Sequence, residues 1–219
     1  METVDQLVPA LALSMGMAWA SGINLYAALL TLGVLANTGN IELPQQLQIV
    51  ANPLVMSAAG VMYILEFIAD KIPGIDSGWD AVHSFVRIPA GAMLAATAIG
   101  DVTPAAHLAA AILGGGLAAA THATKAGSRV LINTSPEPVS NWSASLGEDV
   151  AVVAGVWTSL HHPLVFLGLL LLFVLLMVWL LPRLWRGIKR VVSRLAALFK
   201  RASKPPARAK AADSDGKQS

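Results

Sequence analysis

The side chains best suited to chemistry lie between residues 63 and 87, inside a chain that is otherwise strongly apolar. Two sets of residues there keep helical spacing, so we expect each set to share one face of a helix. The first set is Tyr63, Glu66 and Asp70, and the second is Asp76, Asp80, His83 and Arg87. If the two faces meet across the intervening turn, carboxylates, an imidazole and an arginine come together.

The cost of burying these carboxylates limits their role. An ionised side chain at the centre of a bilayer costs about 2.5–3.5 kcal/mol, so four carboxylates facing lipid would cost on the order of 10 kcal/mol. They must therefore face water, one another or a cation. One interpretation is an ion-pair network that holds the turn, and another is a proton- or cation-handling site with Glu66, Asp70 and Arg87. A third is a divalent-metal site, because oxygen and nitrogen donors suit such ions. Its donors would be Asp76, Asp80 and His83.

Further polar residues lie in other apolar stretches. Cations inside a membrane protein pair with carboxylates or bind anionic head groups. The expected pairs join Arg87 or Arg129 to Glu66, Glu148 or Asp149. Uncharged residues either line a substrate path or form hydrogen bonds between helices, and this choice stays open for Ser21, Asn24, Thr121 and Thr124. The remaining transport or gating candidates are Lys125 and Asn141.

The elements that must position these residues are apolar helices. The chain of 219 residues is 55% hydrophobic and 13% charged, whereas soluble domains are about 25% charged. The absence of cysteine excludes disulfides and thiolate metal sites. A membrane span needs about 20 apolar residues, and candidate stretches occur at 7–36, 53–67, 88–100, 105–125, 145–160 and 163–181. The polar run 21–24 interrupts the first stretch. We therefore predict an all-α integral membrane protein with about six transmembrane or re-entrant helices in a membrane domain over 7–182.

The basic residues are distributed in a way that predicts topology. They form three blocks, namely Lys71 with Arg87, Lys125 with Arg129, and a run from Arg183 to Lys217. Six spans would place all three blocks on one side, and the positive-inside rule makes that side the cytoplasm. This reasoning places both the N- and the C-terminus in the cytoplasm.

Two segments of the chain match each other without gaps. Residues 16–24 resemble residues 116–124 in their small and hydroxyl side chains. If they belong to repeats over 7–101 and 105–182, each repeat holds three spans, and the two halves must be inverted. Inverted repeats with interrupted helices are frequent in secondary transporters. The alternative is a chance match between helices rich in alanine and glycine.

The segment 183–203 has apolar residues at helical spacing with cations on the other face. It is typical of an amphipathic helix at the anionic inner surface of a membrane. Its role is either a topological anchor or lipid sensing and partner docking, and residues 204–219 are predicted to be disordered. Because the basic excess is confined to this region, it does not indicate nucleic-acid binding. The cations expected at the surface are Arg183, Arg186, Lys189, Arg190, Arg194, Lys200 and Arg201.

Three motifs carry a resemblance to a known family. They are Ala20-Ser21-Gly22-Ile23-Asn24, Glu66-x3-Asp70-Lys71-Ile72-Pro73-Gly74-x-Asp76-x2-Trp79-Asp80-x2-His83-x3-Arg87 and Asn141-x3-Ser145-x2-Glu148-Asp149. These motifs resemble an uncharacterised membrane family of bacteria and plastids, catalogued as domain of unknown function 4126. The resemblance implies a multi-span protein of the bacterial inner membrane, and it implies no activity.

The function predicted from these observations is a small transporter or channel for an ion or small polar solute. It would be homo-oligomeric and need no cofactor, and Glu66→Gln would abolish flux without unfolding the protein. One alternative is a membrane-embedded enzyme that acts on a lipid head group with a divalent cation. Another is a structural or assembly protein whose basic tail docks partners.

Overall fold

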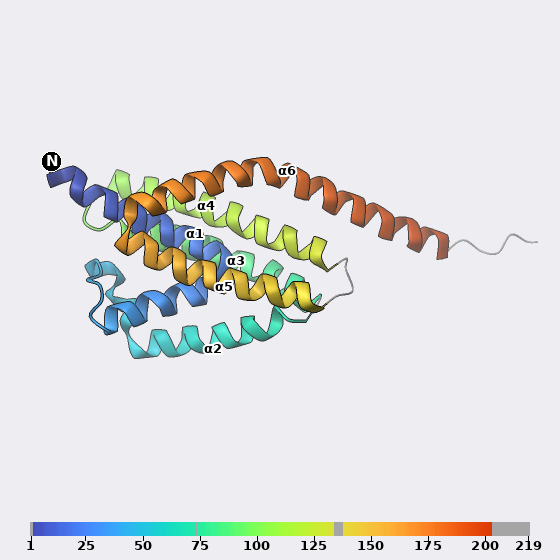
Figure 1. Ribbon diagram of the computed structural model, residues 1–219, viewed down its shortest axis with the longest axis horizontal. Helices are drawn as coiled ribbons and strands as arrows, with labels where there is room; N and C mark the ends of the chain where they lie inside the picture. The colour runs from blue at the N-terminus through green and yellow to red at the C-terminus, as the bar shows by residue number, and fades with distance from the viewer. Residues whose placement is uncertain (1, 73, 134–137, 203–219) are drawn as a thin grey trace, which may run out of the picture.

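The computed structural model describes residues 2–72, 74–133 and 138–202, without the side chains of 2–5, 138, 191 and 194–202. Every regular element in these ranges is a helix, which confirms the all-α prediction (Figure 1). The elements are α1 (Glu2–Asn37), the 3-10 helix η1 (Gln45–Ala51), α2 (Pro53–Ala69), α3 (Ile75–Ala98), α4 (Pro104–Ile132), α5 (Pro138–His161) and α6 (Pro163–Ala202).

Proline fixes where most of the helices begin. Four helices start with proline, a residue that suits the first helical position because the missing N–H has no partner there anyway. Two of these starts also have a side-chain cap. Asn52 accepts a hydrogen bond from the Leu54 amide before α2, and Thr103 accepts one from the Ala106 amide before α4.

Helix α1 is broken at Asn24, which has a non-helical backbone (φ −146°, ψ 96°). The Asn24 side chain accepts a hydrogen bond from the Ala27 amide (3.0 Å) and so caps the second half of the helix. The carbonyl of Ile23 accepts a hydrogen bond from Lys125 Nζ (3.0 Å). The predicted interruption at 21–24 is therefore a true break, and polar side chains satisfy the backbone groups that it frees.

The chain reverses direction at this break. Before it, α1 runs parallel to α6, because Ala12 packs near Phe166 and Trp19 near Phe173. After it, the chain runs antiparallel to α2, because Asn24 and Tyr63 both bind Asp149 whereas Asn37 lies beside Met56. Helix α1 thus begins and ends at the same end of the bundle (Figure 1).

This reversal bears on the predicted topology. The start of α1 and the end of α6 lie at opposite ends of the bundle (Figure 1), and the structure does not show on which side of a membrane either chain end lies. The prediction that both chain ends share one side counted α1 as one crossing, whereas its two halves run in opposite directions. We call the end where α2 meets α3, near Lys71, the basic end. The other end carries Glu42 and Asp101.

The matched segments 16–24 and 116–124 pack against each other. A Cβ on Gly114 would lie 3.4 Å from the Ala18 Cβ, and four residues further along each helix a Cβ on Gly22 would lie 2.6 Å from the Ala118 carbonyl oxygen. The two segments therefore run in parallel, whereas an inverted repeat needs corresponding helices to run in opposite directions. The structure does not confirm the inverted-repeat prediction, and the shared small residues serve close packing of the two helices.

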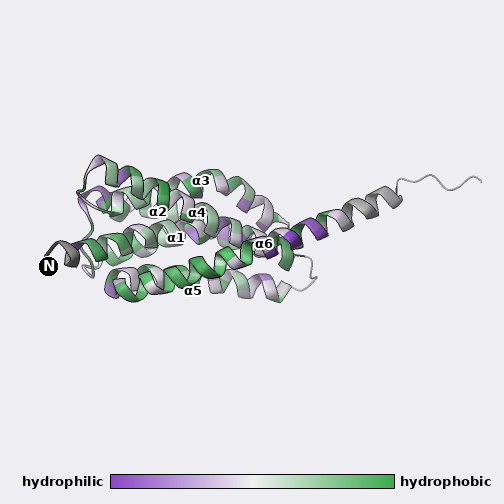
Figure 2. Ribbon diagram, turned by 90° about the horizontal axis from the view of Figure 1, so that it is seen from above, coloured by the Kyte–Doolittle hydropathy of each residue, from purple (hydrophilic) through white to green (hydrophobic). Residues whose placement is uncertain are grey.

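The segment 183–203 was expected to form a separate surface helix, but α6 continues without interruption to Ala202. Leu184 and Ile188 lie beside Gly127 of α4, and Leu131 lies beside Gly187. Figure 2 shows α6 changing from hydrophobic to hydrophilic colours along its length. Residues 204–219, and the side chains of Arg194, Lys200 and Arg201, lie outside the described residues.

Several of the described helices are long and apolar enough to cross a membrane. Three qualify singly: 6–37, 104–132 and 163–190. The bent pair of η1 and α2 raises the number to as many as four. Helix α1 qualifies by length and composition only, because its break turns it back. Helices α3 and α5 lie beside it and carry much of the polar site.

Candidate functional site

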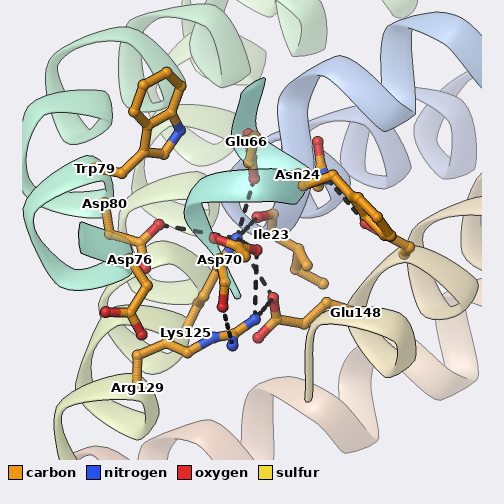
Figure 3. A network of polar contacts seen from close by, with 12 residues as sticks. Ile23, Asn24, Glu66, Asp70, Asp76, Trp79, Asp80, Lys125, Arg129 and Glu148 are labelled. Carbon is orange, nitrogen blue, oxygen red and sulfur yellow. Dashed lines mark hydrogen bonds and ion pairs between the residues drawn. The ribbon is translucent and has the colours of Figure 1, made fainter. Parts of the chain in front are cut away.

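Seven charged side chains form one contiguous group, which we call the ion cluster (Figure 3). They come from four elements: the end of α2, α3, α4 and α5. Its members are Glu66, Asp70, Asp80, Arg87, Lys125, Arg129 and Glu148. All are buried except Glu148, whose side chain is 19% exposed.

Arg87 joins two carboxylates from different helices. It donates hydrogen bonds to Glu66 on α2 and to Asp80 on its own helix (2.8 Å). Asp80 lies seven residues before Arg87, two helical turns away, so helix geometry brings the pair together. Both side chains of the Arg87–Glu66 pair are fully buried, and charge-assisted hydrogen bonds of this kind are about twice as strong as neutral ones.

Lys125 is the centre of the cluster. Its ammonium lies 3.1 Å from Glu66, 3.4 Å from Asp70 and 3.4 Å from Glu148. It also donates to the Ile23 carbonyl that the α1 break leaves free. Lys125 therefore connects the cluster directly to the backbone of the broken helix (Figure 3).

Arg129 lies one helical turn beyond Lys125 on α4 and binds the carboxylates at the end of α2 and on α5. It donates to Glu148 (2.8 Å), to Asp70 (3.4 Å) and to the Asn141 carbonyl (3.0 Å). These contacts tie α4 to α2 and α5. The predicted pairs Arg87–Glu66 and Arg129–Glu148 are both present.

The cluster has more acid than base. Four carboxylates face three cations among the described residues, so full ionisation would leave one surplus negative charge. One oxygen each of Glu66, Asp70 and Asp80 is buried and finds no hydrogen-bond partner in the described part of the chain. Because an uncompensated buried charge is costly, this composition favours the uptake of one proton.

Asp70 follows the last residue of α2 and is 2% exposed. Burial raises the pKa of its carboxyl from 3.8 to about 6. Lys125 and Arg129 lower this pKa, while Glu66 and Glu148 raise it, and the loss of hydration dominates. The carboxyl best placed to take the proton therefore lies at the basic end of α2.

A second polar group, centred on the Asp149 carboxyl, lies directly beside the ion cluster at the α1 break. Asn24 donates to one oxygen of Asp149 (2.9 Å), and Tyr63 donates to the other (2.9 Å). Ser21 donates to the backbone carbonyl of Arg87 (2.8 Å). The predicted neighbours Asn24 and Ser21 are thus both in contact with the site.

The two threonines predicted to face the same path are placed differently. Thr121 is buried beside Gly22, and its hydroxyl lacks a hydrogen-bond partner among the described residues. Thr124 is half-buried and donates to the Ala120 carbonyl of its own helix. Only Thr121 therefore borders the α1 break.

The three residues considered as metal ligands have separate partners. Asp76 accepts hydrogen bonds from Asn133 (2.8 and 2.9 Å), Asp80 pairs with Arg87, and His83 stacks on Trp79. Within the described ranges, no three histidine or acidic side chains are grouped as metal ligands. Asp80 belongs instead to the ion cluster.

Sequence reasoning missed some contributors to the site. His122 contacts Arg87 (3.2 Å) and the Ser84 hydroxyl (2.7 Å). Asn133 connects Asp76 to Asn141. The signal for His122 was its place one turn before Lys125, whereas no spacing in the sequence relates Asn133 to Asp76.

The family of the chain is decided by a match that covers most of its length. The family model described as "Domain of unknown function (DUF4126)" matches residues 11–183. The chain belongs to the DUF4126 family. The match includes the whole ion cluster and the α1 break. The chain matches neither a curated protein nor a solved structure, so the DUF4126 assignment carries no activity with it.

Proposed function

We propose that this DUF4126 protein is a membrane transporter in which the broken helix α1 moves and the ion cluster couples that movement to a proton. The observation that carries this proposal is the contact between Lys125 and the freed Ile23 carbonyl. Secondary transporters commonly place broken helices at their ion sites, where freed backbone groups take part in binding. Here one residue, Lys125, contacts both the α1 break and the carboxylates of the ion cluster.

The distribution of side chains supports a membrane location. Large apolar residues of α6, such as Leu171 and Leu172, are more than 60% exposed, while Glu66 and Arg87 are fully buried. A surface that is apolar outside and charged inside suits hydrocarbon as the solvent. The positive-inside rule then places the basic end in the cytoplasm of a bacterial inner membrane, and the start of α1 on the opposite side.

The proposed coupling follows from the contacts of Asp70. As an ion, Asp70 attracts Lys125 and Arg129. Protonation removes this attraction and leaves Lys125 with fewer anionic partners. Because Lys125 also binds the Ile23 carbonyl, protonation changes the balance of charge at the α1 break. Glu66 is a partner of both Arg87 and Lys125. Neutralising Glu66 should therefore disturb transport.

Movement at the break is testable because the chain has no cysteine. Single cysteines at Ser21 and Thr121, both buried here, would be exposed to a membrane-impermeant thiol reagent in proteoliposomes. We expect the reagent to label both cysteines from an aqueous side. We also expect Glu66→Gln, added to either cysteine variant, to change the rate of this labelling. The matched control is Val156→Cys, a fully buried position in the core away from the break.

The control separates transport from a static architecture. If Ser21→Cys and Thr121→Cys react no faster than Val156→Cys, the break does not open and the proposal fails. If the protein is a structural or assembly protein, Ser21→Cys and Thr121→Cys should react no faster than Val156→Cys. A metal-dependent enzyme has less support, because no three histidine or acidic side chains group as metal ligands among the described residues.

A further inference from the structure

A groove lies at the basic end of the protein, where α6 crosses α3 and α4. Small residues line it from α3 and α4, whereas large apolar residues line it from α6. They include Ala81, Ala123 and Gly127 on one side, and Leu184, Trp185 and Ile188 on the other. The volume of the groove is about 340 Å³, near the lower end of the range for small-molecule sites. This size and lining suit a section of one acyl chain.

The stretch of α6 that lines the groove also carries the exposed cations of this end. No aspartate or glutamate occurs between residues 163 and 202. The ion pairs among the described residues all lie in the ion cluster, so the cations of α6 have no acidic partner there. Helix α6 therefore presents a row of uncompensated positive charges. The exposed members of this row are Arg183, Arg186, Lys189 and Arg190.

Lys189 places one of these charges beside the groove. It lies four residues after Trp185 and so shares its face of α6, and its ammonium lies 5.3 Å from the centre of the Trp185 ring. Arg183 lies two residues before Trp185, on the opposite face, and stacks on Trp179 (3.5 Å). Tryptophan next to basic residues is typical of the level where hydrocarbon meets the lipid head groups.

We infer that this groove holds one anionic phospholipid of the surrounding bilayer, with an acyl chain against Trp185 and the phosphate at Lys189. The inference rests on the membrane location proposed above and not on transport. The uncompensated cations select an anionic lipid over a zwitterionic one. The apolar groove selects a lipid over a soluble acidic partner, which would leave the groove empty. The lipid would contact α4, the helix that carries Lys125 and Arg129.

The test measures which lipid the full-length protein retains. The protein is reconstituted into bilayers of equal parts phosphatidylglycerol and phosphatidylcholine with identical acyl chains, extracted in a mild detergent and studied by native mass spectrometry. We expect phosphatidylglycerol to be enriched at least about fivefold among the retained lipids, which corresponds to about 1 kcal/mol. Retention of both lipids in equal amounts would overturn the inference and leave the cations to a soluble acidic partner.

Two variants that remove the same charge separate a defined site from general attraction to a negative surface. Lys189→Gln removes the cation beside the groove and should lower the enrichment about fivefold. Arg183→Gln removes a cation from the opposite face of α6 and should preserve most of the enrichment. Both side chains are exposed, so neither change disturbs the core. Equal losses in the two variants would show diffuse attraction and reject the site.

A third variant tests the groove itself. Ala123→Phe fills the groove while every cation of α6 stays, and it should lower the amount of retained phosphatidylglycerol. Ala109→Phe is the matched control, because Ala109 is an exposed alanine of the same helix about 21 Å away. Unchanged retention in Ala123→Phe would reject the groove. If Ala123→Phe does not fold, the comparison of Lys189→Gln with Arg183→Gln decides.

Lipid retention and movement at the α1 break are separate readouts. Enrichment of phosphatidylglycerol without labelling of Ser21→Cys would support the groove and reject transport. Labelling without enrichment would reject the groove and leave the transport proposal intact.

Discussion

Arg87 is the residue on which the ion cluster depends most. It is fully buried and binds Glu66 and Asp80, which are fully buried themselves. Its own backbone carbonyl accepts a hydrogen bond from Ser21. Loss of one partner from such a network leaves a charge without compensation, and this costs more than the intact pair contributes.

We therefore predict that Arg87→Met destabilises the protein by about 3–5 kcal/mol. The measurement is unfolding by denaturing detergent in mixed micelles. Arg183→Met is the matched control, because Arg183 is exposed and contacts Trp179 of its own helix; its cost should stay below about 1 kcal/mol. Glu66→Gln added to Arg87→Met should recover part of the loss. Equal losses in the two single variants would show that the cluster is not a tight network.

The buried carboxyl of Asp70 should make the stability of the protein depend on pH. Because burial raises its pKa from 3.8 to about 6, its contribution to stability is fully present below pH 3.8 and is lost as the pH rises through about 6. An infrared titration should show a protonated carboxyl band with a midpoint near 6 that is missing in Asp70→Asn. Asp101→Asn should keep that band. A midpoint at the ordinary value of 3.8 would contradict the prediction.

Single residues show how far sequence reasoning reaches. The pairs Arg87–Glu66 and Arg129–Glu148 could be predicted, because cations in apolar helices need anionic partners. Asp80 could not be assigned, because its spacing to His83 and its spacing to Arg87 both fit one helical face. The structure decides by turning Asp80 toward Arg87 and stacking His83 on Trp79.

At the scale of the element, α1 is the most informative helix. The polar run at 21–24 was enough to predict an interruption, because Asn24 can cap a new helix. The reversal could not be predicted. It depends on Lys125, Asp149 and the packing against α2, all distant in sequence.

Helices α3 and α4 pack so closely at Gly114 that this position should not tolerate a side chain. A Cβ on Gly114 would overlap that of Ala95 and lie 3.1 Å from the Gly91 carbonyl, whereas Gly116 has nothing within 4 Å. We predict that Gly114→Ala costs about 1–3 kcal/mol and that Gly116→Ala stabilises by about 0.5–1 kcal/mol. Thermal unfolding in detergent checks both. A neutral Gly114→Ala would mean that the contact can relax.

At the scale of the whole molecule, the arrangement of helices differs from the sequence prediction where symmetry was assumed. The match between 16–24 and 116–124 suggested inversion, but small residues are also what two parallel helices need for close contact. Composition predicted about six spans, whereas three described helices are long and apolar enough to cross a membrane, or as many as four spans if the bent pair counts as one. It could not tell their direction, because a helix and its reverse have the same hydropathy.

The topology predicts opposite sides for two exposed positions. Thr38 lies at the end where α1 begins, and Ser193 lies near the far end of α6. In a sealed vesicle, Thr38→Cys and Ser193→Cys should react with an impermeant thiol reagent from different compartments. Both should react once the bilayer is dissolved. Labelling of both from one compartment would restore the even number of crossings and contradict the reversal of α1.

The break in α1 also has a consequence for biogenesis. The hydrogen-bond partner of Ile23 is Lys125, 102 positions later, and that of Asn24 is Asp149, 125 positions later. Until the ribosome has supplied α4 and α5, the opening hairpin has no partners for its exposed backbone. Helix α1 is thus synthesised before the residues that satisfy its break, and a nascent chain that ended before α5 would leave the polar groups of this hairpin without their partners.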